Sequence, residues 1–133
     1  MSQENVETVE AGLRAFNERD VEKFAELVTG DFEWIPAVSS AVDTDVYVGR
    51  AGINRYFSES GDIWRQLSVL HDELRDLNDS VLMLGRAVGR GLGSGVEVET
   101  QLAFIAAFRG GRMSKVSTYL RHDEALKAVG LTG

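Results

Sequence analysis

Residues 6–34 of this chain read VETVEAGLRAFNERDVEKFAELVTGDFEW. Apolar side chains recur in the first part at intervals of three or four residues, which places them on one face of a helix. These side chains are Val6, Val9, Leu13 and Phe16. The stretch predicts a long amphipathic helix, a two-residue break at Arg19 and Asp20, and then a second, shorter helix.

Asp20 is expected to cap that second helix, because an aspartate side chain accepts a hydrogen bond from a free backbone N–H of the first turn. The apolar stripe of the helix is formed by Val21, Phe24, Ala25 and Val28. A strand is predicted from Asp31 to Pro36, followed by a loop rich in Ser, Asp and Thr that reaches Tyr47. A third helix should begin near Arg50 and turn Ile53, Tyr56 and Phe57 inward.

The second half changes to the alternating pattern of strands, predicted at 66–77, 81–92, 96–108 and 112–120. The turns between them contain residues that tolerate positive φ, as tight hairpins require. They are Asn78 with Asp79, Gly93 to Gly95, and Gly110 with Gly111. A short helix should follow at 123–129. Helices first and a meander after indicate an α+β fold, with the helices on one face of the sheet.

Composition fits one domain over residues 1–133, with 44% hydrophobic residues. The chain has no cysteine, which excludes disulfides and thiolate chemistry. A net charge of −7 argues against a nucleic acid or an anionic membrane as partner. No apolar run approaches the roughly 20 residues that span a bilayer, and the first residues lack a signal-peptide pattern. A cytoplasmic location is therefore expected.

Simple hairpin closure predicts how the strands align. One row would hold Asp72, Gly85, Ala103 and Thr118, and the next Leu70, Ala87, Gln101 and Leu120. The residues of that face are mostly small, namely Gly85, Ala87, Gly89, Gly91, Ala103 and Ala107. Small residues there indicate either a helix that approaches closely or an open cavity, and the pattern leaves both readings open.

The functional reading is a pocket between the helices and the sheet. Trp34 and Tyr56 would rim it, and its polar groups would be Asp72, Gln101 and Thr118. Burial without a cationic partner would raise the pKa of Asp72 toward neutrality, which would suit a general base. The alternative is that Asp72 is a solvated strand residue.

Arg86 and Tyr119 complete the candidate substrate-binding residues. An arginine inside the pocket would orient a carboxylate substrate, although Arg86 could equally serve an interface or a salt bridge. The opposite face would carry His71, Arg86, Leu102 and Tyr119, with Val69, Leu84, Val88 and Phe104 nearby. Both faces of the sheet are then partly apolar, so the sheet of a second copy is expected to cover the outer one.

Neither a metal nor a cofactor is expected. The two histidines, His71 and His122, show no metal-ligand spacing with Asp or Glu. The glycines between Gly89 and Gly95 alternate along a strand without a following helix, so they do not form a phosphate-binding loop.

Phe16, Asn17, Glu18, Arg19 and Asp20 stand at the break between the first two helices. This run, in this order of elements, resembles the SnoaL-like, polyketide cyclase-related branch of the NTF2-like superfamily. The likeness covers nearly the whole chain. It implies an α+β cone, with three N-terminal helices packed on a curved antiparallel sheet, a short C-terminal helix and a homodimer.

The resemblance also bears on chemistry. In ketosteroid isomerase relatives, the acting tyrosine and aspartate would fall here on Gly12 and Pro36, and a later acid near Phe104, so that activity is not expected. The Asp-Arg-Asp arrangement of epoxide hydrolase relatives cannot be placed around Arg86. SnoaL-type cyclases use a carboxylate in the pocket, a role for which Asp72 is the candidate.

Two classes of function remain open. The first is binding of a small, largely apolar organic molecule in the cone, with or without cofactor-free acid/base chemistry such as isomerisation or cyclisation. The second is a non-catalytic, dimeric ligand-binding or interaction module. A cavity that holds a buried carboxylate would favour the first class, and a cone filled by side chains would favour the second.

Overall fold

The computed structural model describes residues 2–36, 46–91 and 95–130. Three helices and two short strands come first: α1 (Ser2–Asn17), α2 (Val21–Glu26), β1 (Val28–Ile35), β2 (Tyr47–Val48) and α3 (Gly49–Ile63). Four strands and a last helix follow: β3 (Trp64–Asp76), β4 (Ser80–Gly91), β5 (Glu97–Arg109), β6 (Arg112–Tyr119) and α4 (His122–Ala128). The predicted elements are therefore present, with β2 added. The predicted loop before Tyr47 and most of the turn at Gly93 lie outside the described residues.

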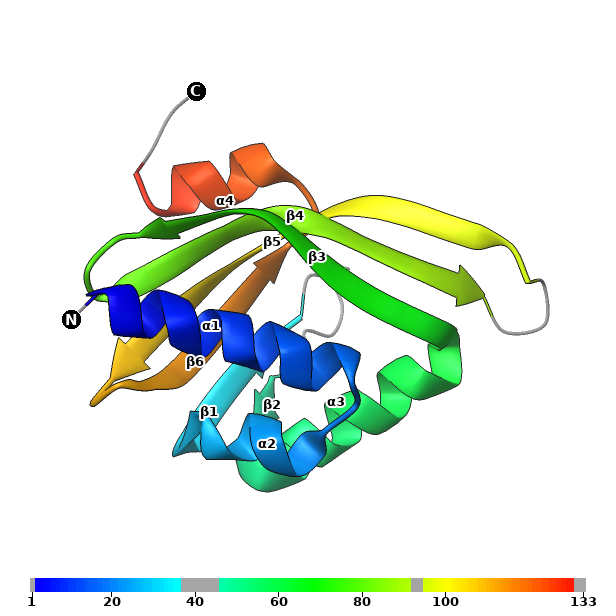
Figure 1. Cartoon of the computed structure of the whole chain (residues 1–133), viewed down its shortest axis with the longest axis horizontal. Helices are drawn as coiled ribbons and strands as arrows, with labels where there is room; N and C mark the ends of the chain where they lie inside the picture. Colours follow the sequence, from blue (N-terminus) through cyan, green and yellow to red (C-terminus); the bar gives the residue numbers. More distant parts are fainter. Residues whose placement is uncertain (1, 37–45, 92–94, 131–133) are drawn as a thin grey trace.

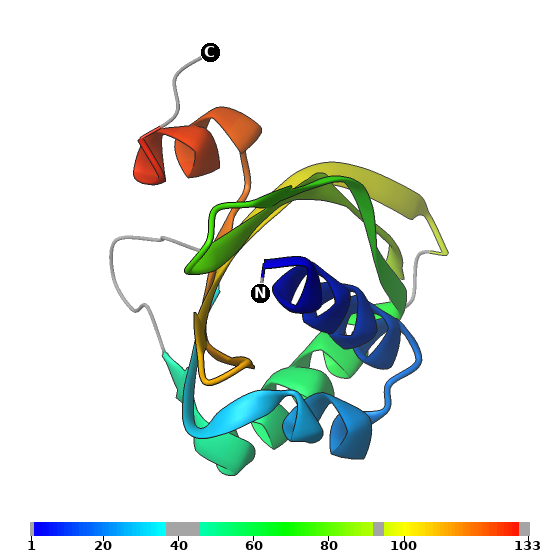
Figure 2. The same ribbon diagram turned by 60° about the vertical axis from the view of Figure 1, so that its left-hand side comes forward.

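The six strands form one curved sheet in the order β2-β1-β6-β5-β4-β3. In Figures 1 and 2 the sheet arches over α1, with α2 and α3 on the same side and α4 on the other. The predicted α+β cone is confirmed. The sheet is mixed rather than wholly antiparallel, because β1 runs parallel to β6. None of the described helices is long and apolar enough to cross a membrane.

The main core lies between the inner face of the sheet and helices α1 to α3. The apolar face predicted for the first helix is buried there, with Val9 at 1% and Phe16 at 5% exposure. Phe32, Ile53 and Met83 are among the largest side chains that are completely buried. Burial of such side chains is the main favourable contribution to folding.

The turns at Asn78 and at Gly110 form as predicted, but the predicted pairing of the strands is wrong by one residue. Asn78, Gly110 and Gly111 adopt positive φ at the ends of their hairpins. Gly85 pairs with Leu102 rather than with Ala103. A one-residue shift moves every side chain to the other face of the sheet. Leu102 therefore faces the helices, and Ala103 faces outward.

A second irregularity lies between β3 and β4. The pairing runs regularly from Gln66 with Arg90 to His71 with Gly85 and resumes at Glu73 and Leu84, so Asp72 is an extra residue without a partner. This is the geometry of a β-bulge, which bends the strand and redirects neighbouring side chains. Hairpin closure alone does not predict it.

Helix α4 covers part of the outer face that the sequence assigned to a partner sheet. Its Ala125 is fully buried against Leu82, Leu84 and Ala103. The start of the helix is tied to the sheet, since the His122 backbone N–H donates to Gln101 Oε1 at 3.0 Å. His122 Nε2 lies 2.7 Å from the carbonyl oxygen of Gly85.

Asn17, the last residue of α1, joins this helix to the edge of the sheet. Its Nδ2 donates to the Val69 carbonyl at 2.9 Å, and its Oδ1 accepts from the Val69 N–H at 2.8 Å. Because β3 is an edge strand, these two backbone groups have no neighbouring strand on that side. Asn17 takes the place of such a strand, which fixes α1 and blocks edge pairing at Val69.

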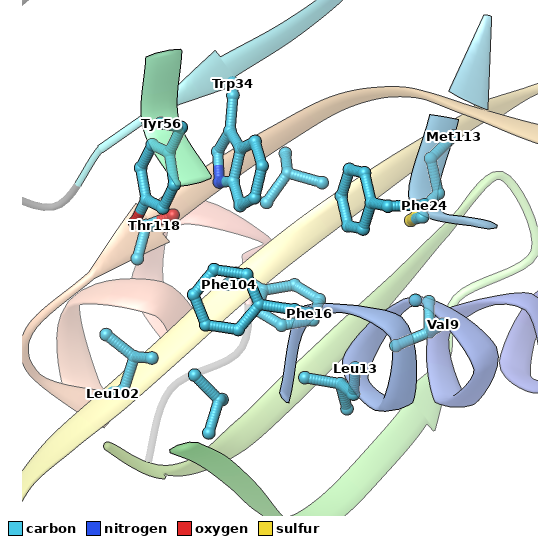
Figure 3. Close-up of a pocket in the computed structure, with 13 residues that line it drawn as sticks. Val9, Leu13, Phe16, Phe24, Trp34, Tyr56, Leu102, Phe104, Met113 and Thr118 are labelled. Carbon is cyan, nitrogen blue, oxygen red and sulfur yellow. The ribbon is translucent and has the colours of Figure 1, made fainter. Parts of the chain in front are cut away.

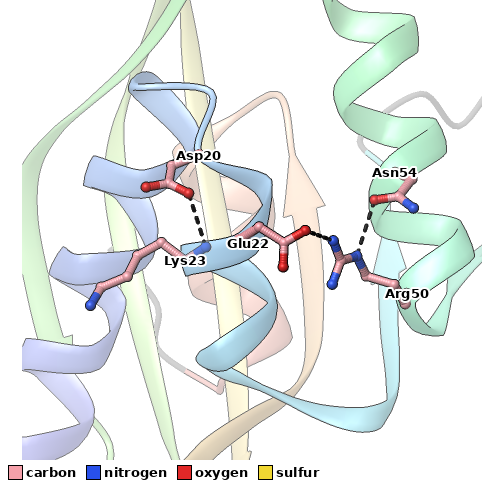
Figure 4. Close-up of polar contacts among 5 residues, drawn as sticks. All are labelled: Asp20, Glu22, Lys23, Arg50 and Asn54. Atoms are coloured by element: carbon pink, nitrogen blue, oxygen red, sulfur yellow. Dashed lines mark hydrogen bonds and ion pairs between the residues drawn. The ribbon is translucent and has the colours of Figure 1, made fainter.

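Polar contacts at the surface position α2 and α3 (Figure 4). Asp20 caps α2 as predicted, since its side chain accepts from the Lys23 N–H at 3.0 Å. Glu22 forms an ion pair with Arg50, whose Nε donates to Asn54 at 3.2 Å. These groups are exposed, so they contribute little to stability and mainly orient α3, the helix that carries Tyr56.

Candidate functional site

An apolar cavity of about 60 Å³ lies between α1, α2, α3 and the inner face of the sheet. Figure 3 shows it with the side chains that surround it. The helices and β1 contribute Val9, Gly12, Leu13, Phe16, Phe24, Trp34 and Tyr56, and the remaining strands Val69, Leu102, Phe104, Met113, Val116 and Thr118. No carboxylate, imidazole, ammonium or guanidinium group is among these lining residues of the described chain.

An aromatic stack forms one wall of the cavity. The Trp34 ring lies between Tyr56, with ring centroids 4.0 Å apart, and Phe24, at 4.9 Å. The three rings are nearly parallel, with interplanar angles of 11° and 8°. Phe16 and Phe57 contact the stack edge-on, which is a favoured aromatic geometry. The wall is therefore held from several elements at once.

The polar atoms of the cavity gather at one end. Figure 3 shows the indole nitrogen of Trp34 and the hydroxyls of Tyr56 and Thr118 there, away from Val9 and Met113. No hydrogen bond joins these three groups to any other residue in the described part of the chain, and none of their atoms is sealed from solvent. They are free to bind a ligand or water.

Solvent reaches the cavity from this polar end. Tyr56, Leu102 and Thr118 are half-buried. At the other end, Val9 and Met113 are only 1% and 3% exposed. The cavity therefore has a polar entrance and a closed apolar end.

Tyr56 is the one titratable group among the described lining residues. Burial raises its pKa to about 12, and the neighbouring Tyr47 adds to the rise, while the Arg19 guanidinium opposes it. The phenol thus stays protonated at neutral pH and acts as a hydrogen-bond donor, not as a base.

We expect Tyr56 to titrate later than an ordinary tyrosine. Its pKa is raised above the ordinary 10.0, so the stability contribution of the neutral phenol is fully present below pH 10 and is lost as the pH rises through 12. Absorbance at 295 nm should show one late transition, and Tyr56→Phe should remove it. A late transition that persists in Tyr56→Phe would contradict the assignment.

Three of the predicted site residues converge on the cavity. Trp34 from β1, Tyr56 from α3 and Thr118 from β6 all line it. Asp72 does not. Its side chain is 55% exposed, and its Oδ1 lies 3.6 Å from Arg86 Nε. The burial without a cationic partner that would make Asp72 a general base is therefore not found.

Gln101, Arg86 and Tyr119 also lie outside the cavity. Gln101 is exposed and accepts the hydrogen bond at the start of α4. Arg86 approaches Glu99 at 3.8 Å in addition to Asp72. Tyr119 packs with the outer cluster beneath α4. The structure thus brings together three of the seven predicted residues and places the other four outside the cavity.

Sequence reasoning missed several lining residues, above all Gly12, Leu102, Phe104 and Met113. The shifted register hid Leu102 and Phe104, because it assigned them to the outer face. A glycine within an amphipathic helix was the signal for Gly12. No group of three His, Asp or Glu side chains suited to a metal ion occurs within residues 2–36, 46–91 and 95–130.

The family model described as the SnoaL-like domain matches residues 9–116. A search of curated proteins found no match.

Solved structures show the same fold at low identity. An NTF2-like protein of unknown function from Burkholderia pseudomallei is 16% identical with a TM-score of 0.79, and the match covers 96% of this chain and 98% of that one. TerC, co-crystallised with polyporic acid, is 18% identical with a TM-score of 0.78 over 89% of this chain and 92% of its own. SalBIII, an epoxide hydrolase/cyclase-like enzyme in pyran ring formation of salinomycin, is 19% identical with a TM-score of 0.76 over 90% and 92%.

Proposed function

Because this chain belongs to the SnoaL-like domain family, we propose that it binds a small, largely apolar organic molecule in the cavity between α1 and the sheet. One observation carries the proposal: the cavity is apolar along its walls, yet Trp34, Tyr56 and Thr118 present three unpaired polar groups at its entrance. Ligand sites commonly combine apolar walls with a few polar groups. The complex of the similar protein TerC with an organic molecule agrees with this reading.

The ligand should be neutral and carry a hydrogen-bond acceptor, such as a carbonyl oxygen. Trp34 Nε1 only donates, and the hydroxyls of Tyr56 and Thr118 donate when an acceptor faces them. A charged group would lose its hydration without gaining an ion pair, because the described lining residues carry no charge. An uncharged polar head with an apolar body fits all of these groups.

Acid/base catalysis finds less support than binding. The described lining residues include no carboxylate, and Tyr56 holds its proton to a pKa of about 12. Tyr56 could donate a hydrogen bond to a developing oxyanion, but a base would have to come from the substrate or from water. A ligand-binding role therefore stands first, and isomerase or cyclase chemistry second.

Binding can be tested with three probes of equal carbon number: 2-pentanone, pentanoate and pentylammonium. We expect the ketone alone to shift the NMR signal of the Trp34 Nε1–H. Tyr56→Phe and Thr118→Val keep the shape of the wall and remove one hydroxyl each. Each should weaken ketone binding about threefold to tenfold, the worth of one neutral hydrogen bond.

Asp72→Asn is the matched control, because Asp72 is exposed and lies outside the cavity. It should leave ketone binding unchanged, and a clear loss of ketone affinity would indicate that Asp72 contributes to the site. Preferred binding of pentanoate or pentylammonium would contradict a neutral ligand. No shift with any probe would contradict the binding function itself.

We further propose that the chain forms a homodimer through the outer face of the sheet beyond α4. There Leu70, 40% exposed, and the half-buried Val88 stand beside Arg86 and Glu99. Two copies related by a two-fold axis would bury these apolar residues and pair the opposite charges. The cytoplasmic location stays a prediction from the sequence.

Sedimentation equilibrium tests the dimer. Val88→Glu should convert dimers to monomers, since it places a charge in the proposed interface. Val98→Glu is the control, because Val98 is exposed but shares the face of Leu102, on the cavity side. A wild-type monomer, or an equal effect of both variants, would contradict this interface.

A further inference from the structure

The closed end of the cavity is formed around a glycine in the middle of α1. Gly12 is buried and lines the cavity. A Cβ atom placed on it would lie 3.1 Å from Met113 Cε and 3.8 Å from a ring carbon of Phe24. Figure 3 shows Met113 and Phe24 at the end of the cavity away from Tyr56 and Thr118. Gly12 therefore belongs to the floor of the site.

Glycine is a costly residue at this position. In the interior of a helix it is less favourable than alanine by about 1 kcal/mol. Here the nearest contact of an added Cβ is the end of a flexible methionine side chain, not backbone. Packing alone thus does not demand a glycine at residue 12, whereas the space beside it is part of the cavity.

We infer that Gly12 is a specificity-determining residue, which sets how long an apolar tail the site accepts. The ligand enters tail first, its acceptor stays with Tyr56 and Thr118, and its tail ends at Gly12. The inference rests on the proposed binding function. It assigns an aliphatic or otherwise slender tail to the ligand, because the whole cavity measures about 60 Å³.

A series of straight-chain 2-alkanones, from 2-propanone to 2-octanone, tests the inference. In the wild type, affinity should rise about fourfold with each added CH₂, which corresponds to about 0.8 kcal/mol per buried CH₂, until the tail meets Gly12 and the rise stops. In Gly12→Ala the rise should stop one carbon earlier. The longest ketone that the wild type accommodates should then bind about fourfold more weakly.

Two further variants serve as a control and as a second test of the closed end. Gly30→Ala makes the same chemical change where no atom lies within 4 Å of the new Cβ, so the chain-length limit should not move. Val9→Ala removes side-chain volume from the same closed end, so the limit should move to a longer ketone. It also supplies a readout if Gly12→Ala does not fold, although alanine should keep or raise the Tm.

The possible outcomes distinguish a failure of the proposed binding function from a failure of the role assigned to Gly12. No binding of any 2-alkanone by the wild type would overturn the proposed function. Binding with a limit that a folded Gly12→Ala variant does not move would overturn the role of Gly12 alone. If Gly12→Ala does not fold, an unchanged limit in Val9→Ala would do so. A limit that shifts equally in Gly30→Ala would also overturn it, since that change does not touch the cavity.

Discussion

Gly85→Ala is expected to destabilise the protein by about 3 kcal/mol or more, at the upper end of what overpacking costs. An added Cβ would lie 2.1 Å from the Leu70 carbonyl oxygen, 2.8 Å from Met83 Sδ and 3.0 Å from His71 Cα. Two of these atoms belong to the backbone of the neighbouring strand, so no side-chain rotation relieves the contact. The strands β3 and β4 would have to separate at the bulge.

Urea denaturation measures this effect as a change in the free energy of unfolding. Gly30→Ala serves as the control, because it adds a methyl to another strand glycine with no neighbour within 4 Å. The control should stay within about 0.5 kcal/mol of the wild type, as surface substitutions usually do. If Gly85→Ala changed the free energy of unfolding no more than the control, the close contact between β3 and Gly85 would be contradicted.

Trp34→Ala is the second large effect, with an expected loss of about 3 to 5 kcal/mol, which is typical for removal of a buried aromatic side chain. Trp34 is 7% exposed and is stacked between Tyr56 and Phe24. Its removal leaves Tyr56 and Phe24 without their common partner. Since small domains are stable by only about 5 to 15 kcal/mol in total, the variant should be only partly folded at 37 °C.

Trp34→Phe separates packing from the polar role of the indole. A phenyl ring keeps much of the stack, so this variant should lose far less stability than Trp34→Ala. It lacks the Nε1–H donor, however, and should bind 2-pentanone more weakly. A loss below about 1 kcal/mol in Trp34→Ala would show that the aromatic wall is not part of the stable core.

Much of the fold follows from local patterns. The spacing of the apolar residues in α1 predicts that Val9 and Phe16 share one buried face, because an α-helix has 3.6 residues per turn whatever surrounds it. Asp20 caps α2, since capping needs only an oxygen beside a free N–H in the next turn. The hairpin turns likewise form at Asn78 and Gly110, where the chain itself favours positive φ.

Some residues of the candidate site could also be predicted from local patterns, and others could not. Trp34 and Tyr56 were predicted as rim residues, since the element that holds each of them has a recognisable inward face. Asp72 was misplaced because the bulge at this residue depends on how two strands meet, not on either strand alone. A separate one-residue difference, in the pairing of β4 with β5, exchanged Leu102 and Ala103 between the faces.

The sequence by itself determined most of the helices and strands and which face of α1 is apolar, because those properties depend on neighbours within one or two turns of chain. Tertiary structure alone decided that Leu102 and Phe104 line the cavity, that Asp72 lies outside it and that α4 covers the outer face. Contacts between segments far apart in the chain depend on strand register and the curvature of the sheet. A single extra residue at Asp72 changes both, and no local pattern marks it.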